Sequence, residues 1–111
     1  MHYKYADSAG EDGDFSAKVQ AIEEFDKSVP EMLALEPDVV VVAGDHSTPA
    51  VMAAHSWHPV PVLIYGKDVR SDLTDSFGER AAIGGELGLF PAKELMPLAL
   101  AHAGKLAKYG A

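Results

Sequence analysis

Apolar side chains recur every three or four positions early in the chain and form one stripe: Phe15, Val19, Ile22, Phe25 and Val29. Charged residues lie between them, so the spacing predicts an amphipathic helix. Asp14 precedes this series and is a suitable N-cap. Pro30 restarts or bends the helix, which we expect to end near Leu35.

Two further apolar runs predict strands. Residues 39–43 are β-branched and uniformly apolar, which is typical of a strand buried on both faces. Residues 60–65 predict a second buried strand, and residues 2–5, which alternate polar and aromatic side chains, predict a short opening strand. The segment 7–14 is rich in turn residues and is expected to be a loop.

Three more helices complete the predicted order of elements. One is expected at 49–54, with Ser47 or Thr48 as its cap and Pro49 in the first turn. A second is expected around 76–82, and a closing helix over 97–108. Strands that alternate with helices predict an α/β fold with a mostly parallel sheet and helices on both faces. The absence of a linker predicts one domain over 1–111.

Composition narrows the classes of function. The 111 residues carry a formal net charge of −8, which disfavours binding to nucleic acid or to an anionic membrane surface. The chain has no cysteine, so disulfides and thiolate zinc sites are excluded. No apolar run approaches the roughly 20 residues of a membrane span. These features lead us to expect a cytoplasmic protein.

Candidate metal ligands fall beside the predicted strands. Asp7 and Glu11 follow the opening strand, Asp45 and His46 follow the second, and His55 precedes the third. In parallel sheets ligands gather at the carboxyl ends of the strands. Carboxylates and imidazoles together suit zinc, manganese and similar ions, and two ions about 3.5–4 Å apart would hold a phosphoryl group.

Each candidate also has a structural interpretation. Asp45 and His46 are a common structural pair after a strand, Asp7 and Glu11 suit a solvated acidic loop, and His55 suits a cap or surface position. Their joint placement favours the metal site. The glycine-rich segment 84–88 does not follow a strong strand, so it does not indicate a dinucleotide site.

The chain resembles a known family over nearly its whole length. Its most specific segments are GDHSTP at 44–49 and HSWHPVPV at 55–62. Three other segments agree: 4–26, 77–88 and 95–111. Together they resemble the C-terminal region of archaeal-type cofactor-independent phosphoglycerate mutases, which belong to the alkaline phosphatase superfamily of metalloenzymes. The resemblance implies an alkaline-phosphatase-like fold that is incomplete in this chain.

The resemblance also implies a function and a set of site residues. Asp7, Glu11 and His55 would bind one divalent ion, and Asp45 and His46 would help to bind another. The family interconverts 3-phosphoglycerate and 2-phosphoglycerate without 2,3-bisphosphoglycerate, through a serine that takes and returns the phosphoryl group. Arg80 would lie near the phosphate or carboxylate of the substrate, with a simple surface position as the alternative.

The chain departs from the family in two ways. Many relatives carry His where this chain has Glu11, and the harder carboxylate favours manganese, with magnesium, zinc or cobalt as alternatives. The nucleophilic serine and another aspartate ligand of the family lie in an N-terminal part that has no counterpart here. We therefore expect the isolated chain to be inactive and to self-associate through a sheet edge. Another phosphohydrolase of the superfamily and a non-catalytic truncated metal-binding module remain alternatives.

Overall fold

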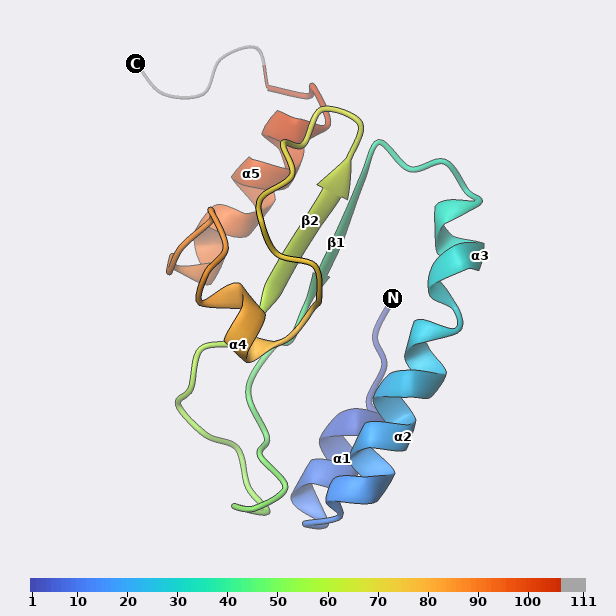
Figure 1. The fold of residues 1–111 in the computed structure, drawn as a ribbon, viewed down its shortest axis with the longest axis vertical. Helices are drawn as coiled ribbons and strands as arrows, with labels where there is room; N and C mark the ends of the chain where they lie inside the picture. The colour runs from blue at the N-terminus through green and yellow to red at the C-terminus, as the bar shows by residue number, and fades with distance from the viewer. Residues whose placement is uncertain (107–111) are drawn as a thin grey trace. The chain divides into compact units, whose positions relative to one another are not determined.

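The computed structural model describes residues 1–106, and Figure 1 shows its helices and strands in chain order. The elements are α1 (Tyr5–Glu11), α2 (Phe15–Asp26), α3 (Val29–Leu33), β1 (Val39–Ala43), β2 (Val62–Gly66), α4 (Glu79–Ala82), the 3-10 helix η1 (Ala92–Glu94) and α5 (Leu95–His102). They fall into two compact units. The first unit contains Met1–Glu36 and Asp45–Pro59, and the second contains Pro37–Gly44 and the described residues from Val60 onward. The expectation of one domain stays a prediction.

The first unit opens with a helical hairpin where the sequence predicts a strand and a loop. Residues 2–4 form no strand, and residues 5–11 form α1. The helix ends in a Schellman motif, in which the amide of Gly13 donates to the Gly10 carbonyl and the amide of Asp14 donates to the Ala9 carbonyl. Gly13 takes the left-handed conformation that this motif requires, with φ at 72°. The turn residues therefore end a helix instead of forming a loop.

The prediction of α2 is confirmed at its start. Asp14 caps the helix by accepting a hydrogen bond of 2.8 Å from the amide of Ala17. The predicted helix divides near Pro30 into α2 and α3, and α3 ends at Leu33. The apolar stripe is not buried, because Phe15 and Ile22 are exposed. A different face of α2 packs on α1.

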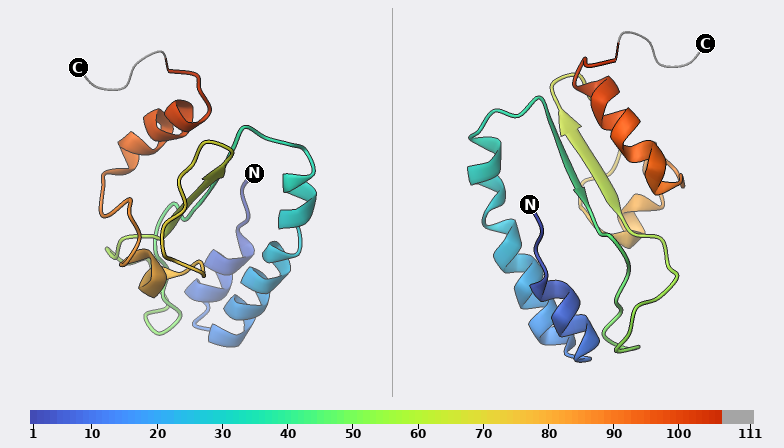
Figure 2. Two further views of the ribbon diagram at one scale, coloured as in Figure 1. Left: turned by 45° about the horizontal axis from the view of Figure 1, so that its top comes forward. Right: turned by 180° about the vertical axis from the view of Figure 1, so that it is seen from behind.

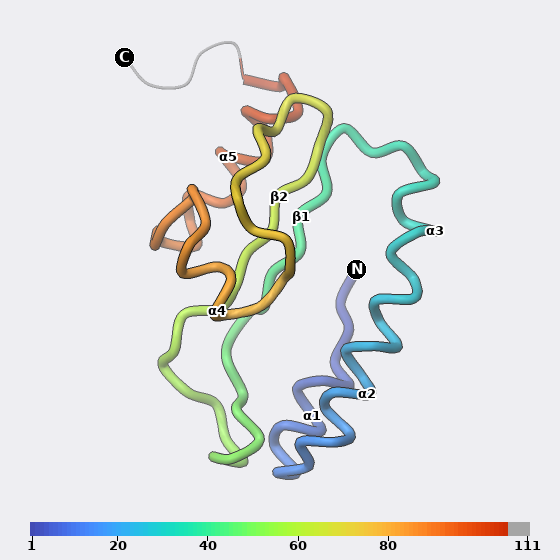
Figure 3. Tube along the Cα trace, in the orientation of Figure 1, coloured from blue at the N-terminus to red at the C-terminus, as the bar shows by residue number. Residues whose placement is uncertain are grey.

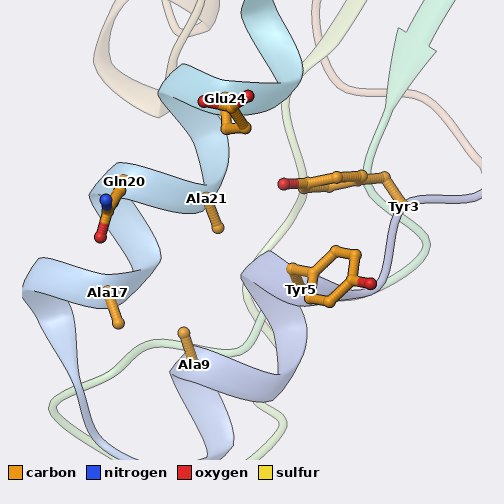
Figure 4. Close-up of a pocket in the computed structure, with 7 residues that line it drawn as sticks. All are labelled: Tyr3, Tyr5, Ala9, Ala17, Gln20, Ala21 and Glu24. Carbon is orange, nitrogen blue, oxygen red and sulfur yellow. The ribbon is translucent and has the colours of Figure 1, made fainter.

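That face of α2 forms part of a shallow groove of about 400 Å³, which Figure 4 shows in close-up. The small side chains of Ala9, Ala17 and Ala21 point toward it, and Tyr3 and Tyr5 lie at one end. The ring centroid of Tyr3 lies 5.2 Å from that of Tyr5 and 5.2 Å from that of Phe25 on α2. The N-terminal aromatic residues thus pack on a helix, and this packing replaces the predicted opening strand.

The sheet of the second unit has two strands that run antiparallel, so the prediction of a mostly parallel sheet is wrong for the described residues. Val39 pairs with Gly66 and Ala43 with Val62. The prediction of β1 is confirmed in its bounds, whereas β2 begins two residues later than expected. Parallel pairing needs a crossover, usually a helix. The residues between the strands do not form one.

The connection between β1 and β2 turns back on itself, as the tube in Figure 3 shows. Ser47 and Ser56 form an isolated antiparallel bridge, in which the Ser56 amide donates to the Ser47 carbonyl at 2.8 Å. Residues 50–53 form turns, and Ala53 has φ at 47°. The helix predicted at 49–54 is therefore wrong. One turn closed by the Pro49 carbonyl takes its place.

Helices α4 and α5 follow in the second unit. Helix α4 is shorter than the segment predicted at 76–82, and α5 begins earlier than the predicted closing helix and ends at His102. The last residues of that prediction, 107 and 108, lie outside the described part of the chain. Helix α5 lies against the strands, as both views in Figure 2 show.

A polar clamp joins two loops of the second unit. Arg70 forms an ion pair of 2.6 Å with the Glu86 carboxylate. The Asp72 carboxylate accepts hydrogen bonds from the hydroxyl and amide of Thr74 and from the Glu86 amide. Polar contacts thus order a segment that has little regular structure.

Apolar burial is sparse throughout residues 1–106. No apolar side chain in this described part is fully buried, and Thr48 is the buried polar residue, at 4% exposure. Among the same residues, no helix combines the length and apolar character that would be needed to cross a membrane.

Candidate metal centre

Helix α1 supplies two carboxylates from one face. Asp7 and Glu11 are four residues apart, which places them one above the other on the helix surface. Tyr5 and Ala9 are each two residues from Asp7 and lie on the opposite side of the helix, where they line the groove. The aromatic groove and the acidic face are therefore separate features of α1.

The segment after β1 supplies the remaining candidate ligands. Asp45 and His46 follow the strand, and the bridge between Ser47 and Ser56 brings His55 beside His46. The two imidazole rings lie with their centroids 3.9 Å apart and their planes at 34°. Residues nine positions apart in the sequence thus present their imidazoles together.

The polar atoms of these residues converge on one another. His55 Nε2 lies 3.6 Å from Asp7 Oδ1 and 3.4 Å from Glu11 Oε1. His46 Nδ1 lies 3.9 Å from Asp7 Oδ1, while His46 Nε2 lies 3.7 Å from Asp45 Oδ2. Asp7, His46 and His55 each offer one ligand atom within a set that spans at most 4.8 Å. The structure therefore brings all five predicted ligands into one neighbourhood.

Asp7 is the least exposed member of this cluster. Its side chain is 17% exposed, and Oδ1 accepts a hydrogen bond of 2.6 Å from the Thr48 hydroxyl. This bond holds the pKa of Asp7 below its ordinary value, against partial burial, which raises it, while Lys4 and His46 add to the lowering. Lys4 lies 3.2 Å from Oδ2. Asp7 is therefore kept in the ionised form that a cation binds.

The donor set fits a divalent cation. Ligand atoms that each lie about 2.1 Å from a common ion are separated by about 3–4 Å. The separations from His55 Nε2 to the carboxylates of Asp7 and Glu11, 3.6 and 3.4 Å, fall in this range. The separation of 3.7 Å between His46 Nε2 and Asp45 Oδ2 does so as well. Asp45 is the most exposed of the five, with 71% of its side chain accessible.

Other predicted residues lie elsewhere or have other contacts. Arg80 is exposed on α4 in the second unit, and its role toward a substrate stays a prediction. His58 Nδ1 lies 2.8 Å from the Ser56 hydroxyl, and its ring stacks on Trp57 at 5.1 Å. Neither His58 nor Trp57 belongs to the cluster of ligand atoms.

Sequence reasoning missed Thr48. It was assigned only as an alternative cap for a helix that does not form, yet its hydroxyl contacts both Asp7 and His46. Thr48 and Asp7 are 41 positions apart, and no periodicity links them. The polar residue between His46 and Pro49 was visible in the sequence, but its partner on α1 appears only in the fold.

Comparison with known families identifies the superfamily of this chain. The model of the metalloenzyme superfamily matches residues 1–102. The chain belongs to the metalloenzyme superfamily. The matched range includes the five candidate ligands, and it shows the family without naming a reaction or a ligand set.

Two curated members of comparable sequence carry a more specific name. A protein of Thermus thermophilus is 56% identical over all 111 residues, which are 27% of its own length. A protein of Thermosipho africanus is 55% identical over the same 111 residues, or 28% of its length. Each is described as a probable 2,3-bisphosphoglycerate-independent phosphoglycerate mutase. The chain thus spans about a quarter of these relatives and corresponds to their C-terminal part.

A solved structure shares the fold. The PH0037 protein from Pyrococcus horikoshii superposes on 96% of this chain with a TM-score of 0.88 and 38% sequence identity. The chain covers 33% of that protein. The fold is therefore an alkaline-phosphatase-like metalloenzyme fold, of which the described residues contain a two-stranded antiparallel sheet and its neighbouring helices.

Proposed function

We propose that this chain forms the C-terminal, metal-binding part of a 2,3-bisphosphoglycerate-independent phosphoglycerate mutase. The observation that carries the proposal is the convergence of Asp7, Glu11 and His55 at 3.4–3.6 Å, with Asp45 and His46 beside them. Whole-chain identity of 56% to a protein described as such a mutase supports the specific reaction. In this role the chain serves the interconversion of 3-phosphoglycerate and 2-phosphoglycerate.

The candidate ligands form two sets, one for each of two cations. His55 with Asp7 and Glu11 would hold one divalent ion, and His46 with Asp45 would contribute to a second. Bound divalent ions neutralise developing charge on a phosphoryl group and orient the oxygens that attack and leave. The three carboxylates of the cluster would repel an anionic phosphate ester if they were left uncompensated. Cation binding is therefore the condition under which this surface accepts such a substrate.

Glu11 bears on the identity of the metal. A carboxylate is a harder ligand than an imidazole, so two carboxylates and one imidazole favour manganese or magnesium over zinc. We propose manganese as the preferred ion. Zinc, magnesium and cobalt are the competing ions in the binding experiment.

Calorimetric titration tests the metal site directly. We expect Mn²⁺ to bind the 111-residue chain, and we expect Asp7→Ala and His55→Ala each to weaken binding strongly because each removes a ligand. His58→Ala is the matched control, since His58 contacts Ser56 outside the cluster. Absence of binding, or equal binding by all four proteins, would refute the site.

A chimaera tests the reaction. This chain would replace the matching 111 residues of the Thermus thermophilus relative, and conversion of 3-phosphoglycerate would be followed by phosphorus NMR. We expect the chimaera to form 2-phosphoglycerate, the Asp7→Ala chimaera to lose activity, and the 111-residue chain alone to show none. Hydrolysis of simple phosphate esters by a folded chimaera, without interconversion, would instead favour a phosphohydrolase.

The same chimaera tests Arg80. If its guanidinium contacts the phosphate or carboxylate of the substrate, Arg80→Met raises KM more than it lowers kcat. Unchanged kinetics would assign Arg80 to the protein surface, where its exposure on α4 places it in this structure.

A further inference from the structure

Thr48 stands out because it is a buried polar residue in direct contact with two proposed metal ligands. Its side chain is 4% exposed. The hydroxyl lies 2.6 Å from Asp7 Oδ1 and 3.1 Å from His46 Nδ1. We infer that Thr48 is a positioning residue that fixes His46 as the Nδ1–H tautomer and leaves Nε2 to coordinate metal. The inference rests on the proposed metal site.

The inference follows from counting protons. A threonine hydroxyl has one proton to donate and lone pairs to accept with, whereas an ionised carboxylate only accepts. The Thr48 hydroxyl therefore donates its proton to Asp7, because a hydrogen bond between these two oxygens needs that proton. Toward His46 the hydroxyl oxygen must accept. His46 Nδ1 must then carry the proton that it donates.

This arrangement assigns each nitrogen of His46 a different role. With Nδ1 protonated, the neutral imidazole carries its lone pair on Nε2. Nε2 is the atom 3.7 Å from Asp45 Oδ2, whereas Nδ1 is the atom 3.9 Å from Asp7 Oδ1. Thr48 therefore directs His46 toward Asp45 and away from joint ligation with Asp7. One hydroxyl thus separates the ligands into two sets.

The surroundings hold Thr48 in place. Lys18 on α2 donates a hydrogen bond from Nζ to the Thr48 carbonyl at 2.5 Å. Gly10 on α1 packs against the same carbonyl so closely that a Cβ at position 10 would overlap it. The backbone of Thr48 is therefore fixed to both helices, and its hydroxyl is aimed by that anchorage.

Histidine tautomers are read by NMR from the coupling of ring nitrogens to ring protons. In the metal-free, ¹⁵N-labelled chain, at a pH where the imidazole is neutral, we expect His46 to be the Nδ1–H tautomer. Thr48→Ser keeps a hydroxyl and should keep the Nδ1–H tautomer of His46. Thr48→Val removes the hydroxyl and should shift His46 toward the Nε2–H tautomer. Ser47→Ala is the neighbouring control and should leave His46 unchanged.

The wild-type spectrum decides the inference even if Thr48→Val fails to fold, because an Nε2–H tautomer in the wild-type chain overturns it. Failure of Thr48→Ser to keep the Nδ1–H tautomer overturns it as well. A Mn²⁺ titration distinguishes failure of the tautomer assignment from failure of the proposed function. Thr48→Val should lower affinity about 10- to 100-fold, as loss of an outer partner of a metal-binding histidine does, and Thr48→Ser should restore it. If the wild-type chain has the expected tautomer and binds no metal, the proposed function fails and the tautomer assignment survives.

Discussion

The contacts inside the first compact unit differ from those inside the second. In the first unit, the two buried residues, Gly10 and Thr48, contact each other beside the candidate ligands. In the second unit, no described residue is buried, and the antiparallel strands leave side chains such as Tyr65 59% exposed. The first unit is therefore specified by close polar contacts between buried residues, whereas the second has no such contact among its described residues. Both units present exposed apolar side chains.

This difference bears on what the isolated chain can do. Hydrogen bonds of the first unit orient ligand atoms without the help of a large apolar core. The exposed apolar residues of either unit gain little until something covers them, since stabilisation scales with the apolar area removed from water. We therefore expect metal binding to be less dependent on the rest of a mutase than catalysis is.

The largest expected effect is association of the whole chain. We expect the isolated chain to self-associate, because unpaired strand edges and exposed apolar side chains recruit other copies. Tyr65→Lys on β2 places a charge at the sheet and should reduce association. Gln20→Lys, at an exposed polar residue on α2, is the control, because it adds the same charge without removing an apolar side chain. Light scattering that shows a clean wild-type monomer would contradict the expectation, and equal effects of both variants would show that the added charge, not its place at the sheet, controls association.

The next effect concerns Gly10. An alanine Cβ would overlap the Thr48 carbonyl, so Gly10→Ala should destabilise the chain by about 3 kcal/mol, at the upper end of overpacking costs, and weaken metal binding. Gly78→Ala is the control, because a Cβ there has open space around it. Urea unfolding measures both variants, and equal stability of the two would show that the Gly10 contact is not required.

A smaller effect is expected at Lys18. Its ammonium donates to the Thr48 carbonyl in a partly buried setting, so Lys18→Met should cost about 2 kcal/mol, as expected for a hydrogen bond to a charged group. Lys27→Met removes an exposed pair with Glu24 on the same helix hairpin and should change stability little. If Lys27→Met lowers the free energy of unfolding as much as Lys18→Met in the same urea experiment, the contact of Lys18 with the Thr48 carbonyl contributes no more than an exposed ion pair.

These contacts also show which features of the fold and the site the sequence predicts and which it does not. The cap at Asp14 and the strand at 39–43 were predicted correctly, because caps and β-branched strands are encoded locally. The predicted burial of that strand on both faces was wrong, since none of its residues is buried. The direction of the sheet was not predicted correctly, because pairing depends on how residues 44–61 fold back. The sequence indicates Asp7 and Glu11 as candidate ligands, but it predicts a loop in place of α1 because Gly10 and Gly13 are typical turn residues. Gly13 does mark a turn, namely the end of that helix.

The smallest effect is a pH dependence in the second unit. Hydrogen bonds from Thr74 and from the Glu86 amide hold the pKa of Asp72 below its ordinary value of 3.8. The stabilisation by this clamp is therefore present above pH 3.8 and is lost as pH falls through the lower folded-state pKa. The amide signals of Thr74 and Glu86 should titrate together below pH 3.8 and should not do so in Asp72→Asn. Titration at or above the ordinary value would contradict the clamp.

The most direct test of the metal site is paramagnetic broadening of the NMR signals of the labelled chain by substoichiometric Mn²⁺. We predict that the signals of the five candidate ligands broaden first, namely Asp7, Glu11, Asp45, His46 and His55. The signals of Asp72 and Glu86 in the polar clamp of the second unit should stay sharp. Broadening spread evenly over exposed carboxylates of both units would show that these five residues form no site.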